Sequence, residues 1–222
     1  MSNQSAANFD LIVFDWDGTL YDSAAAIART IQLSCADLGL PVPSDEAARY
    51  VIGLGLEDAL RHAAPALAEK DYPLIIERYR VNFLARDFEL ELFAGVNELI
   101  PRLAGRGQLL GVATGKSRQG LERALEFTGL GAHFIATRCA DECFSKPHPA
   151  MLEELMDELG CAPERTLMVG DTTHDLQMAK NAGVSSLAVA FGAHPQLALE
   201  AEAPLACVET PAQMVQWLLL HG

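Results

Sequence analysis

Three aspartates, Asp15, Asp17 and Asp22, fall within eight positions of the stretch VFDWDGTLYDS, which spans residues 13–23. Asp15 directly follows the apolar run of residues 11–14, which is typical of a strand buried in a sheet. A carboxylate at the end of a buried strand is costly unless its charge is compensated, and a second carboxylate two positions on repels it. The spacing of Asp15 and Asp17 therefore indicates a site that also holds positive charge.

Three further pieces with polar side chains come at the ends of other predicted strands or just past them. They are Thr114-Gly115, Lys146-Pro147 and Gly170-Asp171-Thr172-Thr173-His174-Asp175. Because open α/β sheets bind ligands outside the carboxyl ends of their strands, we expect all these pieces to line one crevice. Two like unit charges about 4 Å apart repel by about 4 kcal/mol at an effective dielectric constant of 20. A bound Mg²⁺ would turn that repulsion into coordination, so the pattern favours a magnesium site.

The elements that must position these residues follow an alternating pattern. Short apolar runs predict strands of a parallel sheet that is covered on both faces, at residues 11–14, 109–113, 166–169, 184–190 and 205–208. Helical spacing and capping residues predict helices between and after them, at residues 117–127, 149–159, 173–182 and 211–220. This alternation predicts an α/β fold with a Rossmann-like parallel-sheet core.

Residues 22–91 interrupt the alternation with helical patterns alone. A stripe of apolar residues runs from Ile27 to Leu38, Ser44 is placed to cap a second helix, and residues 57–64 and 73–84 also favour helices. We therefore expect an inserted all-helical cap domain at residues 22–91 that covers the site as a lid. The α/β catalytic core would then consist of residues 1–21 and 92–222.

In this order, DWDGTL at residues 15–20, Thr114, Lys146 before a proline and GDTTHD at residues 170–175 resemble the four motifs of the haloacid dehalogenase (HAD) superfamily of hydrolases. The resemblance covers essentially the whole chain. The sequences of the motifs are similar to those of the phosphoglycolate-phosphatase branch. The helical insertion resembles the C1 cap of subfamily IA. The resemblance implies an HAD-like fold and phosphate-ester hydrolysis, because dehalogenases and phosphonate hydrolases lack an acid at the position of Asp17.

The resemblance also implies the roles of the acidic residues. Asp15 would attack phosphorus and form an aspartyl-phosphate. Asp17 would protonate the leaving alkoxide and then act as the base for the hydrolytic water. Asp15, the backbone carbonyl of Asp17, and Asp171 would bind Mg²⁺, and Asp175 would hold a metal-bound water or the lysine of the third motif.

The remaining motif residues would hold the phosphate. By resemblance, Thr114, the backbone N–H of Gly115 and Lys146 bind phosphoryl oxygens. Lys116 and Arg118 lie close by in the sequence and are further candidates near the crevice, although both are residue types that are usually exposed.

Substrate choice would come from the cap, because the core contacts only phosphate. Arg49 lies just before the Gly53-Leu54-Gly55 loop and could bind a substrate carboxylate such as that of phosphoglycolate. In related caps a basic residue near this position faces the active site. The alternative is a surface ion pair of Arg49 with Asp45 or Glu46.

Composition excludes several other classes of protein. The net charge of −14 argues against general nucleic-acid binding, and no apolar run approaches the ~20 residues of a membrane span. The five cysteines are scattered without zinc-site spacing, and the first residues do not resemble a signal peptide. We expect a cytoplasmic protein, monomer or homodimer, whose partner is a small phosphorylated metabolite.

The function predicted from the sequence is thus a Mg²⁺-dependent phosphatase acting on a small phosphomonoester, with 2-phosphoglycolate as the first substrate to consider. A nucleoside monophosphate, pyrophosphate or a sugar phosphate stays open, as does a phosphomutase of the β-phosphoglucomutase type. A regulatory module that only binds phosphate is the non-enzymatic alternative. Among the other polar residues, we expect Asp22 to cap the first cap helix and His174 to be exposed. His148, which follows Lys146-Pro147, is a minor candidate for a supporting role near the site.

Overall fold

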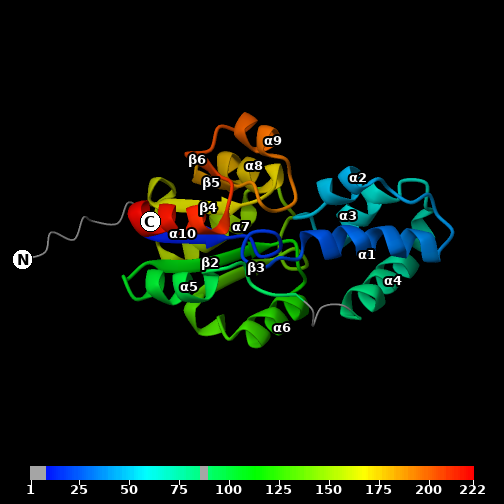
Figure 1. Cartoon of the computed structure of the whole chain (residues 1–222), viewed down its shortest axis with the longest axis horizontal. Helices are drawn as coiled ribbons and strands as arrows, with labels where there is room; N and C mark the ends of the chain where they lie inside the picture. The colour runs from blue at the N-terminus through cyan, green and yellow to red at the C-terminus, as the bar shows by residue number, and fades with distance from the viewer. Residues whose placement is uncertain (1–8, 86–89) are drawn as a thin grey trace, which may run out of the picture.

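One parallel sheet forms the centre of the computed structural model, which describes residues 9–85 and 90–222 (Figure 1). Within these residues, six strands lie in the order β3-β2-β1-β4-β5-β6. They are β1 (Leu11–Phe14), β2 (Leu109–Thr114), β3 (Ala136–Cys139), β4 (Thr166–Gly170), β5 (Ser185–Val189) and β6 (Ala206–Val208). Strand β1 is central, between β2 and β4. The Rossmann-like α/β fold predicted from the sequence is confirmed.

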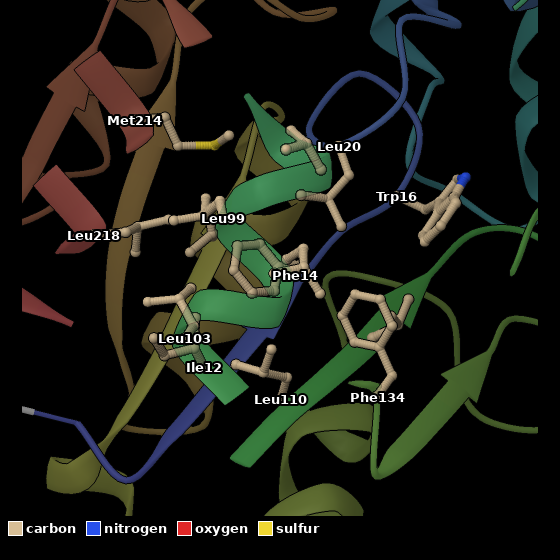
Figure 2. Close-up of a cluster of buried hydrophobic side chains, with 14 of the residues drawn as sticks. Ile12, Phe14, Trp16, Leu20, Leu99, Leu103, Leu110, Phe134, Met214 and Leu218 are labelled. Atoms are coloured by element: carbon tan, nitrogen blue, oxygen red, sulfur yellow. The ribbon is translucent and has the colours of Figure 1, made fainter. Parts of the chain in front are cut away.

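Helices cover both faces of the sheet. One face packs against α5 (Val96–Ala104), α6 (Arg118–Thr128) and α10 (Pro211–His221), and the other against α7 (Ala150–Leu159), α8 (Thr173–Asn181) and α9 (Gln196–Ala201). Ile12 and Phe14 of β1 point to the first face, where Figure 2 shows Phe14 beside Leu99 and Ile12 beside Leu103 of α5. Leu11 and Val13 point to the second face. Because both faces of β1 are buried, its sequence is a continuous apolar run.

The sequence pattern missed three elements of this core: β3, α5 and α9. Strand β3 lies at the edge of the sheet and contains the polar, partly exposed Thr137 and Arg138, so it forms no apolar run. Helix α5 contains Pro101, which is usually a helix breaker, and α9 has only six residues. Three short 3₁₀ helices complete the described elements, at Glu69–Asp71, Gly131–His133 and Pro163–Arg165.

Four helices follow β1 and form a group beside the sheet (blue to green in Figure 1). They are α1 (Ala24–Asp37), α2 (Asp45–Tyr50), α3 (Leu56–Ala63) and α4 (Tyr72–Leu84). The group has its own buried apolar cluster, which includes Ile31 of α1, Leu60 of α3 and Ile75 of α4. Ser44 caps α2 by accepting a hydrogen bond from the backbone N–H of Ala47. The all-helical insertion is therefore confirmed, and we call it the cap. No helix among the described residues is both long and apolar enough to span a membrane.

Two paired segments connect the cap to the core. The backbone N–H of Asp22 donates to the carbonyl of Glu91 at 2.9 Å, and Tyr21 and Leu92 form an isolated antiparallel bridge. The domain boundaries predicted after residues 21 and 91 fall on this pair of segments. We keep the division into 1–21 with 92–222 and 22–91 as a proposal.

The predicted cap role of Asp22 is wrong. Ser23 is the N-cap residue of α1, and Asp22 is exposed one position earlier. The turn that follows β1 runs one residue further than expected, and the hydroxyl of Ser23 is directed to Asp17 instead of to the helix backbone.

Candidate active site

The side chain of Asp15 is buried at the carboxyl end of β1, with 1% of its surface exposed. Its Oδ1 accepts a hydrogen bond from Lys146 Nζ at 2.7 Å, and the same Nζ lies 2.6 Å from Asp175 Oδ1. Lys146 belongs to the loop between β3 and α7, which returns from the edge of the sheet to its centre. The structure thus brings together three residues that are far apart in the sequence.

Burial and the neighbouring charges shift the pKa values of Asp15 and Lys146. Burial raises the pKa of Asp15 to about 7; the ammonium of Lys146 lowers it, and the carboxylate of Asp175 raises it further. Burial lowers the pKa of Lys146, but the carboxylates of Asp15 and Asp175 outweigh burial, so the pKa of Lys146 is raised. Lys146 is therefore a permanent cation between two carboxylates.

Asp171 follows β4 and is fully buried. Its Oδ1 accepts a hydrogen bond from Thr19 Oγ1 at 2.7 Å, and its Oδ2 accepts one from the backbone N–H of Ala193 at 2.7 Å. Burial raises the pKa of Asp171, and the carboxylates of Asp15 and Asp175 raise it further. Gly18 lies against this carboxylate with φ of 83°, and a Cβ at that position would overlap it. Only glycine allows both this left-handed turn and this close approach.

The carboxylates fit a divalent cation. Asp15, Asp171 and Asp175 each offer one oxygen, and these oxygens lie within 4.8 Å of one another. The buried Oδ2 of Asp15 has no hydrogen-bond partner among the described residues. Three buried carboxylates beside one ammonium leave an uncompensated negative charge, which is costly. A set of oxygen donors with spare negative charge suits Mg²⁺.

Asp17 lies outside this three-carboxylate cluster and has its own cation. Its Oδ1 accepts a hydrogen bond from Ser23 Oγ at 2.7 Å, and Lys116 Nζ lies 2.9 Å from each of its two oxygens. The same Nζ lies 5.1 Å from the centroid of the Phe83 ring of α4. Lys116, which the sequence marked only as a nearby candidate, therefore connects Asp17 to the cap. Arg118 instead binds Glu142 at 2.7 Å.

A cavity of about 450 Å³ lies over these groups, between core and cap. Its core side is lined by Asp15, Asp17, Thr114, Gly115 and Lys116. Thr114 is buried at the end of β2, and its Oγ1 accepts a hydrogen bond from the backbone N–H of Lys116 at 3.2 Å. All the core residues predicted for catalysis and phosphate binding, apart from the buried Lys146, Asp171 and Asp175, thus border one space. The last three lie beneath it. Lys146 contacts Asp15 and Asp175, and Asp171 and Asp175 belong to the same carboxylate cluster as Asp15.

Gly115 lets the cap come close to the core. A Cβ at this position would lie 2.7 Å from the carbonyl oxygen of Gly53 and would also overlap the carbonyl oxygen of Leu54. The Gly53-Leu54-Gly55 loop is further fixed by the hydroxyl of Ser145, which accepts a hydrogen bond from the Gly55 N–H at 2.8 Å.

Arg49 is not among the described residues that line the cavity. Its Nε donates to Asp45 Oδ2 at 2.8 Å on the outside of α2. The surface ion pair named as the alternative is therefore what the structure shows. The contact of Arg49 with a substrate carboxylate stays a prediction.

The prediction that His174 is exposed is wrong, since only 6% of its surface is exposed. Its Nε2 lies 2.8 Å from the carbonyl oxygen of Tyr50, and Nε2 of His194 lies 3.0 Å from the same oxygen. The Tyr50 ring stacks on His194, so the end of α2 covers the GDTTHD loop. Burial lowers the pKa of both imidazoles. By contrast, His148 is exposed and stacks on Phe144.

Sequence reasoning missed the hydroxyls that orient the carboxylates. Thr172 donates its hydroxyl to Asp175 Oδ2 at 2.7 Å and its N–H to the same oxygen at 3.1 Å. The Thr172-x-x-Asp175 spacing of a capping box could have revealed this pair. Thr19, Ser23 and His194 carried no comparable signal, because their partners are set by the tertiary fold.

Comparison with known proteins gives a consistent picture. The family model described as haloacid dehalogenase-like hydrolase matches residues 12–189. The chain is 35% identical over 210 residues to a "Probable phosphatase IndB" from Dickeya dadantii, covering 92% of this chain and 91% of that protein. It is 32% identical over 189 residues to a "Phosphoglycolate phosphatase" from Agrobacterium fabrum, covering 82% and 81%. A solved structure from Haemophilus somnus 129pt, described as a predicted phosphoglycolate phosphatase, has the same fold, with a TM-score of 0.84 at 24% identity over 96% of this chain and 99% of that one.

Proposed function

We propose that this chain, which belongs to the haloacid dehalogenase-like hydrolase family, hydrolyses small phosphomonoesters in a Mg²⁺-dependent reaction through an aspartyl-phosphate. The observation that carries the proposal is the convergence of Asp15, Asp171, Asp175 and Lys146 beneath a cavity at the strand ends. The names of the relatives from Dickeya dadantii and Agrobacterium fabrum support it.

In the first step, a carboxylate oxygen of Asp15 forms a bond to phosphorus while the bond from phosphorus to the ester oxygen breaks. Asp17 gives a proton to the departing oxygen, so that a neutral alcohol leaves. In the structure Asp17 is paired with Lys116, which lines the same cavity. An entering phosphate offers the Lys116 ammonium a second anion, which would free Asp17 to take up a proton from water and donate it to the departing oxygen.

In the second step, water attacks the phosphorus of the aspartyl-phosphate, Asp17 takes a proton from that water, and the Asp15 carboxylate leaves with its electron pair. Inorganic phosphate is the product. Lys146 would stabilise the Asp15 carboxylate as a leaving group, because its ammonium lies 2.7 Å from Oδ1 in the structure.

Asp15, Asp171, Asp175 and the backbone carbonyl of Asp17 would hold the metal ion. When bound there, Mg²⁺ would neutralise charge on the phosphoryl oxygens and on the carboxylates around them. Thr114 and the Gly115 N–H would bind the remaining phosphoryl oxygens from the end of β2.

Relatives named phosphoglycolate phosphatase make 2-phosphoglycolate the reference substrate. A phosphomutase uses the same core groups but returns the phosphoryl group to a sugar, so it differs only in the acceptor. The scattered spacing of the five cysteines is the basis for proposing a reducing compartment, the cytoplasm.

Phosphate release from a panel of phosphomonoesters, with Mg²⁺ or with excess chelator, tests this function. We expect release that depends on Mg²⁺, and a phosphorylated Asp15 peptide in the mass spectrum of acid-quenched reactions. Equal release in chelator would remove the metal from the mechanism. Phosphorylation at another residue would remove Asp15 as the nucleophile, and sugar isomerisation without phosphate release would favour the mutase.

A further inference from the structure

The cap lines its side of the cavity mainly with apolar side chains. They come from α1, from the loop after α2 and from α4, and include Ile27, Ile31, Ile52, Ile76, Tyr79 and Phe83. The rings of Tyr79 and Phe83 stack, with centroids 5.9 Å apart and planes at 11°. A ligand group that enters this half of the cavity exchanges water for aliphatic and aromatic surface, which favours an apolar group.

Charged residues around this half do not favour an anionic leaving group. Of the cations that line the cavity, Lys116 is already paired with Asp17, whereas Arg80 and Arg123 are exposed to solvent. The acidic residues Glu57 and Asp58 also line it. A carboxylate that enters this half of the cavity would lose its water without gaining a buried cation, which is costly.

The size of the cavity points the same way. Its volume of about 450 Å³ falls within the range of sites that enclose whole organic ligands. A phosphate and the two-carbon glycolate would leave much of this space to water. An aromatic ring beside Phe83 would fill it and would cover the apolar wall.

We propose that the leaving group of the physiological substrate is an uncharged alcohol with an aromatic or similarly bulky apolar skeleton. The substrate is then an apolar phosphomonoester instead of 2-phosphoglycolate. This inference rests on the proposed phosphatase function, and it names the class of compound on which that function acts.

Two esters and two matched variants test the inference. The values of kcat/KM are measured for 1-naphthyl phosphate and 2-phosphoglycolate with the wild-type protein, Ile76→Asn and Val81→Asn. Ile76 lines the cavity from α4, whereas Val81 lies on the same helix with 51% of its surface exposed. We expect the wild type to prefer 1-naphthyl phosphate by at least about tenfold, since burying one aromatic ring is worth that much or more.

The two variants show whether the apolar wall of the cavity produces the preference for 1-naphthyl phosphate. Ile76→Asn should lower kcat/KM for 1-naphthyl phosphate about tenfold and leave that for 2-phosphoglycolate within about twofold, because only the larger group reaches this wall. Val81→Asn should change neither value. Circular dichroism melting of both variants confirms that they fold, and calorimetric titration of 1-naphthyl phosphate into Asp15→Asn and Asp15→Asn/Ile76→Asn measures binding without turnover.

Three results of these measurements would contradict the inference. A wild type that prefers 2-phosphoglycolate, or an Ile76→Asn variant that weakens both esters equally, overturns the apolar leaving group and leaves the phosphatase function standing. Phosphate release from neither ester, together with no binding of 1-naphthyl phosphate to Asp15→Asn, overturns the inference, and the phosphatase function falls with it only if the whole panel of phosphomonoesters releases no phosphate. Loss of 2-phosphoglycolate turnover in Arg80→Ala or Arg123→Ala would show that the exposed arginines bind a carboxylate, which also contradicts the inference.

Discussion

The two walls of the cavity are built in opposite ways. On the core side, directional contacts hold the carboxylates: Asp15 and Asp17 each bind an ammonium, and Asp171 beneath them accepts two hydrogen bonds. On the cap side, residues such as Ile31 and Ile76 contribute surface without directional bonds. Hydrogen bonds constrain distance and angle, whereas apolar contact constrains mainly volume. The core wall can therefore define a reaction, and the cap wall can define which molecules undergo it.

The nucleophile provides the strongest test of the core wall. Asp15→Asn should lower kcat at least about 10³-fold with every substrate, because an amide cannot replace the attacking carboxylate. Steady-state phosphate release measures the loss. Asp22→Asn serves as the matched control, since Asp22 is an exposed aspartate of the same stretch. Residual activity of the Asp15 variant above about 1% would contradict the nucleophile role.

Lys146 tests the electrostatic balance of the same wall. Lys146→Met leaves Asp15 and Asp175 as buried, unpaired carboxylates, so the free energy of unfolding should fall by about 3 kcal/mol without metal. The value of kcat should fall about 10²-fold, because a fixed cation at the phosphoryl group is lost. Urea unfolding with and without Mg²⁺ gives the first value, and Mg²⁺ should recover part of the stability.

Lys180→Met, an exposed lysine on α8, is the control for this change. A Lys146→Met protein as stable as the wild type in the absence of metal would show that the carboxylates accept protons at no cost. The charge balance described for the core wall would then be incorrect.

The affinity for Mg²⁺ should depend on pH. The pKa of Asp15 is raised to about 7, so below that pH a proton occupies the carboxylate that the metal needs, and above it the carboxylate is free. The Kd for Mg²⁺ should therefore increase by about tenfold from pH 8 to pH 6. Isothermal titration calorimetry in two buffers of different ionisation enthalpy measures both the Kd and the released proton. The Asp15→Asn variant should lose the part of this dependence that comes from Asp15, whereas the raised pKa of Asp171 still contributes its own part. A Kd that is equal at both pH values in the wild type would contradict the prediction.

The smallest effect is expected at Arg49. Its ion pair with Asp45 is on the surface of α2, and such pairs contribute about 0–1 kcal/mol. Arg49→Ala should change kcat/KM for 2-phosphoglycolate and for 1-naphthyl phosphate by less than about twofold. A selective loss with 2-phosphoglycolate would instead support the carboxylate contact predicted from the sequence.

The sequence allowed correct predictions where the chemistry of a side chain and the pattern of its neighbouring residues indicate the same role. Asp15 was predictable because a carboxylate after a buried strand needs compensation. Lys146 was expected in the same crevice, but its role came only from the resemblance, since the edge strand before its loop has no apolar run. The position of Arg49 and the burial of His174 could not be predicted in this way. Both depend on how the cap meets the core, which no local pattern encodes. For the same reason the apolar wall became visible only when α1 and α4 were seen to face one space.

The carbonyl oxygen of Tyr50 has a mechanical consequence. Two imidazoles of the core, from His174 and His194, share this single acceptor at the last residue of α2. Any displacement of α2 away from the core must break both hydrogen bonds together, because neither can follow the oxygen alone. The attachment of α2 to the core is therefore concentrated at one backbone oxygen, so that its loss removes two hydrogen bonds at once.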